Sequence, residues 1–299
     1  MTHTGDLIGL DIGGSTTRGV LFRDGQAVRH AKGPSANVQN VSADAAAAAL
    51  RDVFGELGAG SSAPVVAGAG GVDTPADAVR LEHLIRSVSG ASPEVPVTAV
   101  HDTRLILAAG GHTTGVAVIA GTGSVAWGID STGRERRSGG WGYLLGDEGS
   151  GYWLGREAVR TVLRADQRDP DAAPTAFARA ILEQSQVSSA VELIAAFHDR
   201  PDRSFWAGLS RTVVKFAAHG DAVAQELVQR AASELRSLTT AVAQQLTGPL
   251  PVVLGGGLAP TIVGETLRGL LAESGLTDVT ALDQEPVLGA PVLARAIWG

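Results

Sequence analysis

Residues 7–22 read LIGLDIGGSTTRGVLF: an apolar run leads into Asp11, a turn of small and hydroxyl residues follows, and the chain returns to apolar residues. Short apolar runs on either side of glycine are typical of strands joined by a tight reversal. The backbone N–H groups of such a turn can also point at one anion, and glycine lets a phosphate approach the main chain closely. This stretch therefore predicts two neighbouring strands joined by a turn that is either a plain hairpin or a phosphate-binding turn.

Strand and helix patterns alternate after this stretch. An Asp24-Gly25 pair, which is a signal for a tight hairpin, precedes a third strand at 27–32. A helix, a strand, a second helix and a further strand then follow. They are expected at 41–57, at 64–69, from 75 onward and at 95–100. This alternation predicts a sheet covered by helices.

A second copy of the opening pattern lies further along the chain. Residues 116–137 read VAVIAGTGSVAWGIDSTGRERR: apolar strand, glycine turn, apolar strand, acidic-glycine turn and polar strand. The copies stand about one hundred residues apart, which is the size of a domain. We therefore expect two related α/β domains, at 1–112 and 113–299. The second carries a helical insertion at about 150–246, and the final helix, at 287–297, is a candidate to pack back on the N-terminal domain.

The composition excludes several classes of protein. The 299-residue chain has 31 acidic against 24 basic residues, a net charge of −7 and no cysteine. The missing cysteine excludes disulfides, thiolate zinc sites and cysteine-ligated iron–sulfur clusters. The basic residues are scattered and outnumbered, so we expect no nucleic-acid partner. No apolar run approaches the ~18 residues of a membrane span, and residues 1–6 are a short polar start, so we expect a soluble cytoplasmic protein without a membrane partner.

Three glycine segments each follow an apolar strand, and we name them the first turn, the second turn and the third glycine segment. They are Gly13, Gly14, Ser15, Thr16 and Thr17; Gly121, Thr122, Gly123 and Ser124; and Gly255, Gly256 and Gly257. Any one of them alone fits a hairpin. Three of them at strand ends, two in a repeated frame, favour phosphate binding.

Two familiar nucleotide motifs do not fit these segments. A Walker-type P-loop needs G-x-x-x-x-G-K-[ST], and neither Lys32 nor Lys215 has that context. Residues 121–126 match the dinucleotide pattern G-x-G-x-x-A, but that motif requires a helix directly after the turn, whereas 125–129 reads as a strand. The remaining interpretation is a phosphate clip made of strand, turn and strand.

The three segments, with Asp11 ahead of the first, resemble the actin, hexokinase and Hsp70 superfamily. The stretch SGGWGYLLGDEGSGYWLG, at 138–155, resembles the N-acetylglucosamine kinase group of the BadF/BadG/BcrA/BcrD ATPase family, and the resemblance covers 7–296. It implies two RNase H-like, actin-like ATPase domains, each with a mixed sheet flanked by helices, and ATP and sugar in the cleft between them. It also implies that the first and second turns hold the phosphates of ATP and that the third glycine segment packs against adenosine.

Within this superfamily the missing cysteine excludes the thiolate-bound iron–sulfur cluster of dehydratase activators and the cysteine-rich zinc motif of ROK sugar kinases. The expected function is therefore an ATP- and Mg²⁺-dependent amino-sugar kinase that converts N-acetylglucosamine to its 6-phosphate. Glucosamine, N-acetylmannosamine and N-acetylmuramic acid are alternative acceptors. A function of another class is an Hsp70- or actin-like ATPase switch that acts on a protein partner. A homodimer is expected from the family alone.

Two aspartates carry the expected chemistry. Asp102 ends an apolar strand immediately before a helix, and the resemblance makes it the base that takes the proton of the sugar hydroxyl. Its alternative role is that of a helix N-cap. His101 precedes Asp102. Thr103 and Arg104 follow it, at positions where relatives often have small residues. Asp11 is expected to face the magnesium ion, and its alternative role is that of a buried structural acid.

The resemblance also implies a set of sugar contacts around the base. They are Asn37, Gly70 through its main chain, Asp102, Thr122, Trp141, Asp147 and Gly151. Ordinary alternatives exist for three of them: Asn37 as turn chemistry, Trp141 as a core residue, and Asp147, with Glu148, as a helix cap. Asp73 is expected to cap the helix that follows it.

Overall fold

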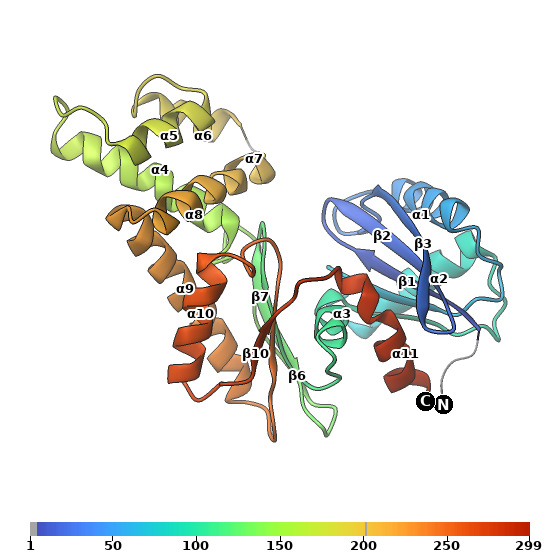
Figure 1. Ribbon diagram of the computed structural model, residues 1–299. Helices are drawn as coiled ribbons and strands as arrows, with labels where there is room; N and C mark the ends of the chain where they lie inside the picture. The colour runs from blue at the N-terminus through green and yellow to red at the C-terminus, as the bar shows by residue number, and fades with distance from the viewer. Residues whose placement is uncertain (1–4, 201) are drawn as a thin grey trace. The chain divides into compact units, whose positions relative to one another are not determined.

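The computed structural model describes residues 5–200 and 202–299, so the polar start of the chain lies mostly outside it. The chain divides into two compact units (Figure 1). Unit 1 comprises Met1–Thr114 with Leu282–Gly299, and unit 2 comprises Gly115–Ala281. Throughout the described ranges, no helix combines the length and the apolar character that crossing a membrane requires.

Unit 1 contains a mixed sheet of five strands in the order β3-β2-β1-β4-β5. Its strands are β1 (Asp6–Ile12), β2 (Thr16–Arg23), β3 (Gln26–Pro34), β4 (Val65–Ala69) and β5 (Val97–His101). The first three strands pair antiparallel, and β4 and β5 continue the sheet in parallel with β1. The turn between β2 and β3 has positive φ at Asp24 and Gly25, which is the geometry that an Asp-Gly hairpin favours.

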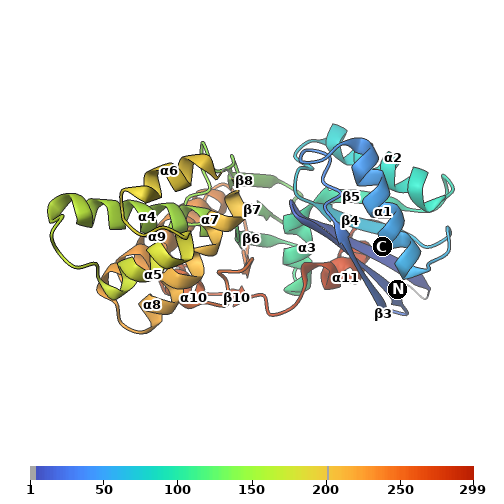
Figure 2. The ribbon, with the colours of Figure 1, turned by 90° about the horizontal axis from the view of Figure 1, so that it is seen from above.

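Helices cover both faces of this sheet (Figure 2). They are α1 (Ala43–Leu57), α2 (Pro75–Ser89), α3 (Asp102–Ala109), the 3₁₀ helix η1 (Pro286–Gly289) and α11 (Ala290–Trp298). One core lies between the sheet and α1 and α2, and a second lies between the sheet and α3, η1 and α11. Gly9 on β1 allows the close approach of α11, because a Cβ atom there would lie 2.6 Å from the Cβ of Ala290.

Unit 2 repeats the topology of the first sheet, with strand order β10-β9-β6-β7-β8. Its strands are β6 (Gly115–Ala120), β7 (Ser124–Ile129), β8 (Glu135–Gly139), β9 (Val252–Gly255) and β10 (Val279–Ala281). In each unit the first strand lies at the centre of the sheet; the sheet continues by antiparallel pairing on one side and by parallel pairing on the other. The predicted fold class, α/β with two mixed sheets flanked by helices, is confirmed.

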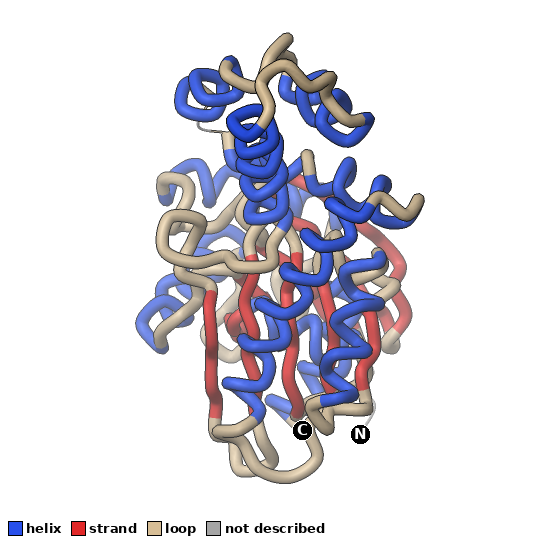
Figure 3. The backbone as a smooth tube through the Cα atoms, turned by 90° about the vertical axis from the view of Figure 1, so that its left-hand side faces the viewer, coloured by secondary structure: helices blue, strands red, loops and turns tan. Residues whose placement is uncertain are grey.

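Helices make up most of the remainder of unit 2. They are α4 (Gly151–Arg168), α5 (Ala176–Ser185), α6 (Glu192–Asp199), α7 (Arg203–Gly208), α8 (Ser210–Ala218), α9 (Ala222–Ala243) and α10 (Ile262–Glu273). Figure 3 shows helices laid over the face of this sheet and others beyond the ends of its strands. Within this helical insertion, α7 and α8 are separate helices because the helix is interrupted at Leu209. The short elements α6 and β10 were not expected, since neither has a pattern long enough to detect.

Candidate active site

The first turn is a closed and braced loop between β1 and β2. The Gly13 N–H donates to the carbonyl of Thr16 at 2.9 Å, and the Ser35 hydroxyl donates to the Gly13 carbonyl at 2.8 Å. The Thr17 hydroxyl is buried and accepts a hydrogen bond from the Ala36 N–H at 2.9 Å. Gly14 and Ser15 remain exposed at the tip. The segment after β3 thus supports the turn from behind and leaves its tip open to a ligand.

Two carboxylates influence each other beside this turn. Burial first, and then the Asp102 carboxylate, raise the pKa of Asp11 to about 6, although the Arg18 guanidinium opposes them. Arg18 lies on the paired position of β2, with its Nη1 3.9 Å from Asp11 Oδ2 and its Nε 3.0 Å from Glu285 Oε1. Sequence patterns gave no indication of the Arg18–Glu285 pair. A cation that joins this site would relieve the repulsion between the two acids.

The residues beside the first turn fit a magnesium ion that shares its ligands with phosphate. Magnesium is commonly held by one or two carboxylates together with substrate phosphates and water. Asp11 offers one mostly buried carboxylate whose pKa is raised first by burial and then by the neighbouring Asp102 carboxylate. Within the described ranges no cluster of three or more histidine or acidic side chains could hold a metal by itself.

Asp102 stands at the junction of β5 and α3 without capping the helix. The cap of α3 is His101, whose Nδ1 accepts a hydrogen bond from the Thr103 N–H at 3.4 Å. The alternative interpretation of Asp102 as an N-cap is therefore wrong. A Cβ atom at Gly70 would lie 3.2 Å from Asp102 Oδ2, and the Asn37 amide donates to the Gly70 carbonyl. The structure thus brings together three predicted site residues of unit 1, namely Asn37, Gly70 and Asp102.

At two other helix starts, neither the expected cap, Asp73, nor the alternative cap, Asp147, is the residue that caps the helix. Thr74 caps α2 in a reciprocal pair with Asp77, so the expected role of Asp73 as the cap is wrong. Ser150 caps α4 by accepting from the Trp153 N–H at 3.2 Å, so Asp147 does not serve as a cap either. Asp73 instead accepts a hydrogen bond from the Gln39 amide at 3.4 Å.

The second turn packs against the start of α4 and against the third glycine segment. The Gly151 N–H donates to the Gly121 carbonyl at 2.7 Å, and the Tyr152 N–H donates to the Thr122 carbonyl at 3.2 Å. Gly256 has a φ of +88°, and a Cβ atom there would lie 2.6 Å from the carbonyl oxygen of Ala120. Segments more than one hundred residues apart in the sequence therefore meet at the end of β6.

Asp147 is a buried acid held against the second turn. Its Oδ1 accepts a hydrogen bond from the Ser124 N–H at 3.3 Å, and its Oδ2 lies 3.1 Å from Arg203 Nη2. A Cβ atom at Gly123 would lie 2.9 Å from both carboxylate oxygens. Burial raises the pKa of Asp147, although the Ser124 N–H and Arg203 oppose it. No local pattern marks Arg203, because it lies 56 residues from its partner.

Trp141 lies on the surface of the loop between β8 and α4. Its side chain is 66% exposed, and Leu144 and Leu145 on the same loop are 80% and 77% exposed. The alternative interpretation of Trp141 as a core residue is therefore wrong. An exposed indole offers a flat apolar face of the kind that stacks on a ring.

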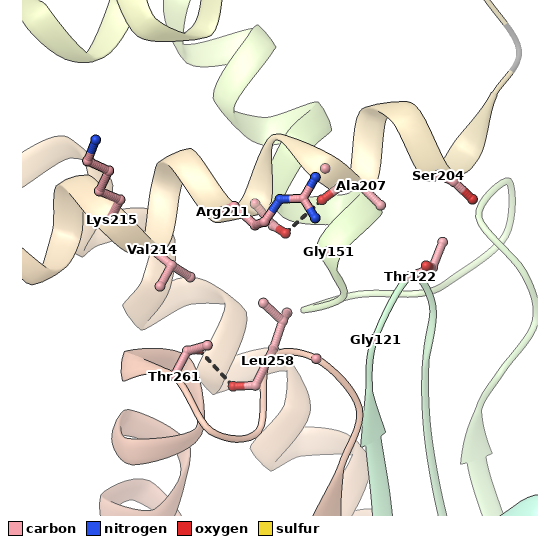
Figure 4. A pocket seen from close by; sticks show the side chains of 13 residues that line it. Gly121, Thr122, Gly151, Ser204, Ala207, Arg211, Val214, Lys215, Leu258 and Thr261 are labelled. Atoms are coloured by element: carbon pink, nitrogen blue, oxygen red, sulfur yellow. Dashed lines mark hydrogen bonds between the residues drawn. The ribbon is translucent and has the colours of Figure 1, made fainter. Parts of the chain in front are cut away.

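A pocket of about 450 Å³ adjoins the second turn in unit 2 (Figure 4). Thr122 and Gly257 line it from the glycine segments, and Arg211 and Lys215 line it from α8. Val214 and Leu258 add apolar side chains. Its volume lies in the range of small-molecule sites, and its mixture of apolar and cationic groups suits a nucleotide. The sequence analysis did not identify Arg211 and Lys215 as site residues, although their spacing of four residues places both side chains on one face of the helix.

The chain belongs to the BadF/BadG/BcrA/BcrD ATPase family, whose pattern matches residues 8–294. Among characterised proteins it is 31% identical over 276 residues to the N-acetyl-D-glucosamine kinase of Dictyostelium discoideum, with 84% of each chain covered. It is 28% identical over 307 residues to the N-acetylmuramic acid/N-acetylglucosamine kinase of Clostridium acetobutylicum, with 97% of this chain and 98% of the relative covered.

Solved structures give the same relationship at the level of the fold. A proposed N-acetylglucosamine kinase from Chromobacterium violaceum superposes with a TM-score of 0.72 at 26% identity, and the alignment covers 97% of this chain and 98% of that one. The resemblance of residues 138–155 to the N-acetylglucosamine kinase group is thus confirmed by relatives along almost the whole chain.

Proposed function

We propose that this protein is an ATP-dependent amino-sugar kinase that transfers the γ-phosphoryl group to O6 of N-acetylglucosamine. The position of Asp102 beside Gly70 and Asn37 carries the assignment. It is supported by the cap of α3 at His101 rather than Asp102, and by the 31% identity to an N-acetyl-D-glucosamine kinase. A carboxylate in this position can accept the proton of a sugar hydroxyl as the hydroxyl attacks phosphorus.

Each unit supplies one part of this chemistry. In unit 1 Asp102 takes the proton, Asn37 and the Gly70 main chain orient the sugar, and the open tip of the first turn binds phosphate. In unit 2 the second turn binds phosphate, the pocket beside Arg211 and Lys215 takes the nucleoside, and Asp147 accepts hydrogen bonds from sugar hydroxyls. Asp11 would hold Mg²⁺, which supplies neutralisation of the phosphate charge when it is bound. Thr122, Trp141 and Gly151 complete the proposed sugar contacts.

The acceptor within the amino sugars is part of the proposal. The Clostridium relative carries both N-acetylmuramic acid and N-acetylglucosamine in its name, so an acidic sugar is a specific alternative. Glucosamine and N-acetylmannosamine differ from these by groups that a single loop can admit or reject. The domain boundaries at 112 and 113, a homodimer, a cytoplasmic location and the lack of nucleic-acid or membrane partners also stay predictions.

The test of the function is ADP release by the purified protein with Mg-ATP, measured with each amino sugar and without sugar. We expect strong stimulation by N-acetylglucosamine and a low rate without sugar, because kinases of this kind protect ATP from water until the acceptor is bound. A steady rate that no sugar changes would contradict the kinase assignment. It would favour the ATPase switch, and protein partners would then be the ligands to seek.

Asp147→Ala is expected to raise the KM for the sugar at least ~10-fold while changing the KM for ATP less than ~3-fold. The variant removes a charged hydrogen-bond acceptor, whose loss typically costs ~1.5–3 kcal/mol. Steady-state kinetics with each substrate varied in turn would measure both constants. Glu148→Gln, which removes a neighbouring negative charge, is the control, and an unchanged sugar KM in Asp147→Ala would refute the assignment of Asp147.

A further inference from the structure

Arg203 joins two parts of unit 2 that lie far apart in the sequence. It is the first residue of α7, and its Nη2 lies 3.1 Å from Oδ2 of Asp147, on the loop between β8 and α4. Its guanidinium also lies over the ring of Tyr143 on the same loop, with Cζ 5.1 Å from the ring centroid. One side chain of the helical insertion therefore contacts the loop at two points.

The backbone of this loop is unfavourable at the position of Asp147. Gly140 and Gly142 have positive φ, which glycine adopts freely, but Asp147 has a φ of +60° as well. A residue with a side chain seldom takes that conformation, and it persists where surrounding contacts impose it. Two hydrogen bonds hold the Asp147 carboxylate: Oδ1 accepts from the Ser124 N–H and Oδ2 accepts from Arg203. Arg203 supplies the charged one of the two.

The position of the guanidinium is set by α7. Trp206 on this helix is buried, and its Nε1 donates to a backbone carbonyl at 2.8 Å. The helix packs closely on α4, where a Cβ atom at Gly155 would collide with the carbonyl group of Trp206. Ser204 and Ala207, from the same helix, line the pocket in Figure 4. Arg203 therefore extends toward Asp147 from an anchored element of the site.

Hydrogen bonds do not satisfy the whole guanidinium in this place. Its Nε is buried and makes no hydrogen bond with the described residues, although 40% of the side chain is exposed. A buried donor without a partner costs free energy, so the contacts that it accompanies must outweigh that cost. An unpaired group of this kind in a native structure calls for a functional reason. The contacts with Asp147 and Tyr143 supply one.

We propose that Arg203 is a positioning residue for the sugar, and this inference rests on the proposed kinase function. It holds the Asp147 carboxylate in place and ionised without touching the sugar itself. Each carboxylate oxygen has two lone pairs, so the bonds from Ser124 and Arg203 leave one on each oxygen for a sugar hydroxyl. Burial raises the pKa of Asp147, and Arg203, after the Ser124 N–H, opposes that rise. The guanidinium thus favours the form of Asp147 that only accepts hydrogen bonds.

The decisive variant is Arg203→Gln, with Arg203→Lys beside it. Glutamine removes the charge, whereas lysine keeps the charge but lacks the planar fork. We expect Arg203→Gln to raise the KM for the sugar about 3- to 10-fold, less than loss of Asp147 itself, because a charge-assisted hydrogen bond to the sugar ligand is lost. Arg203→Lys should recover part of this. The values of kcat and of the KM for ATP should stay within about 3-fold, since only the binding of the sugar is altered.

A double variant separates positioning from folding. Arg203→Gln leaves the Asp147 charge buried with one partner fewer, so it is also expected to lower the melting temperature. In Asp147→Ala that buried charge is absent. Arg203→Gln added to Asp147→Ala should therefore leave the sugar KM within about 2-fold of the value for Asp147→Ala alone. A further rise as large as that of the single variant would mean that Arg203 contacts the sugar directly, and it would overturn the positioning role.

The matched control is Arg164→Gln, which removes an exposed guanidinium from α4 in the same unit. It should leave both KM values and kcat unchanged. Steady-state ADP release, with sugar and ATP varied in turn, would measure all of these constants. An unchanged sugar KM in Arg203→Gln would overturn the proposal and leave Arg203 a purely structural partner of Asp147. A wild-type protein that no sugar stimulates would instead overturn the proposed function, and this inference with it.

Discussion

Asp102→Asn is expected to lower kcat at least ~100-fold while leaving the binding of ATP and sugar nearly unchanged, which is the usual scale for loss of a general base. Asparagine has the same shape and still forms hydrogen bonds, but it cannot take the proton of the sugar hydroxyl. The fold should tolerate it, because His101 rather than Asp102 caps α3. Single-turnover and steady-state ADP release would measure kcat, and calorimetry with sugar and ADP would measure binding.

The comparison variant for Asp102→Asn is Asp44→Asn, at an exposed position in the first turn of α1. It removes the same charge from the same unit and should keep wild-type turnover. If Asp102→Asn retained near-normal kcat, Asp102 would have no role as the base. If it lost sugar binding together with kcat, Asp102 would act chiefly as a sugar ligand.

Much of the fold could be predicted because its signals are local. The Asp24-Gly25 pair specifies a hairpin through positive φ at both residues, and the structure has that turn. The repeat of a strand, turn, strand pattern at 7–22 and 116–129 predicted two sheets of one topology, and the strand orders agree. The break between α7 and α8 at Leu209 could not be predicted, since the apolar pattern continues across it.

The candidate site likewise contains residues that the sequence predicts and residues that it cannot predict. Asp11, Asp102 and the glycine turns stand at strand ends, where position in the sequence indicates position at the edge of a sheet. Arg203 cannot be recognised beforehand, because its contact with Asp147 depends on how the inserted helices pack. The capping role expected for Asp73, and the capping roles considered as alternatives for Asp102 and Asp147, were wrong for a physical reason: the N-cap is set by the backbone one or a few residues away, at Thr74, His101 and Ser150.

Asp11→Asn is expected to change stability and activity in opposite directions. Burial, together with repulsion from Asp102, raises the pKa of Asp11 from 3.8 to about 6. The folded protein therefore binds this proton more tightly than the unfolded chain, and the stability of the metal-free protein falls as pH rises from about 4 to about 6. Above about pH 6 Asp11 is ionised in the folded protein too, and the whole free-energy cost of its buried charge lowers the stability. Asparagine removes it, so the metal-free variant should be more stable than the wild type by about 1–3 kcal/mol at pH 7.5.

That advantage should shrink toward pH 4, where wild-type Asp11 is protonated as well. Turnover should fall at least ~100-fold, because a charged group that acts on the developing phosphate charge is lost. Denaturant unfolding in EDTA at both pH values, with ADP release in Mg-ATP, would test both parts.

Asp130→Asn is a control for which the expected change in stability has the opposite sign. Asp130 is also buried, but hydrogen bonds from Thr132 and from backbone N–H groups lower its pKa to about 2. Asp130→Asn should therefore destabilise the protein at pH 7.5, where Asp11→Asn stabilises it. If Asp11→Asn destabilised the protein and kept its activity, Asp11 would be a structural acid that the fold needs. A gain in stability with loss of turnover is instead the signature of a charge that folding disfavours and phosphate chemistry requires.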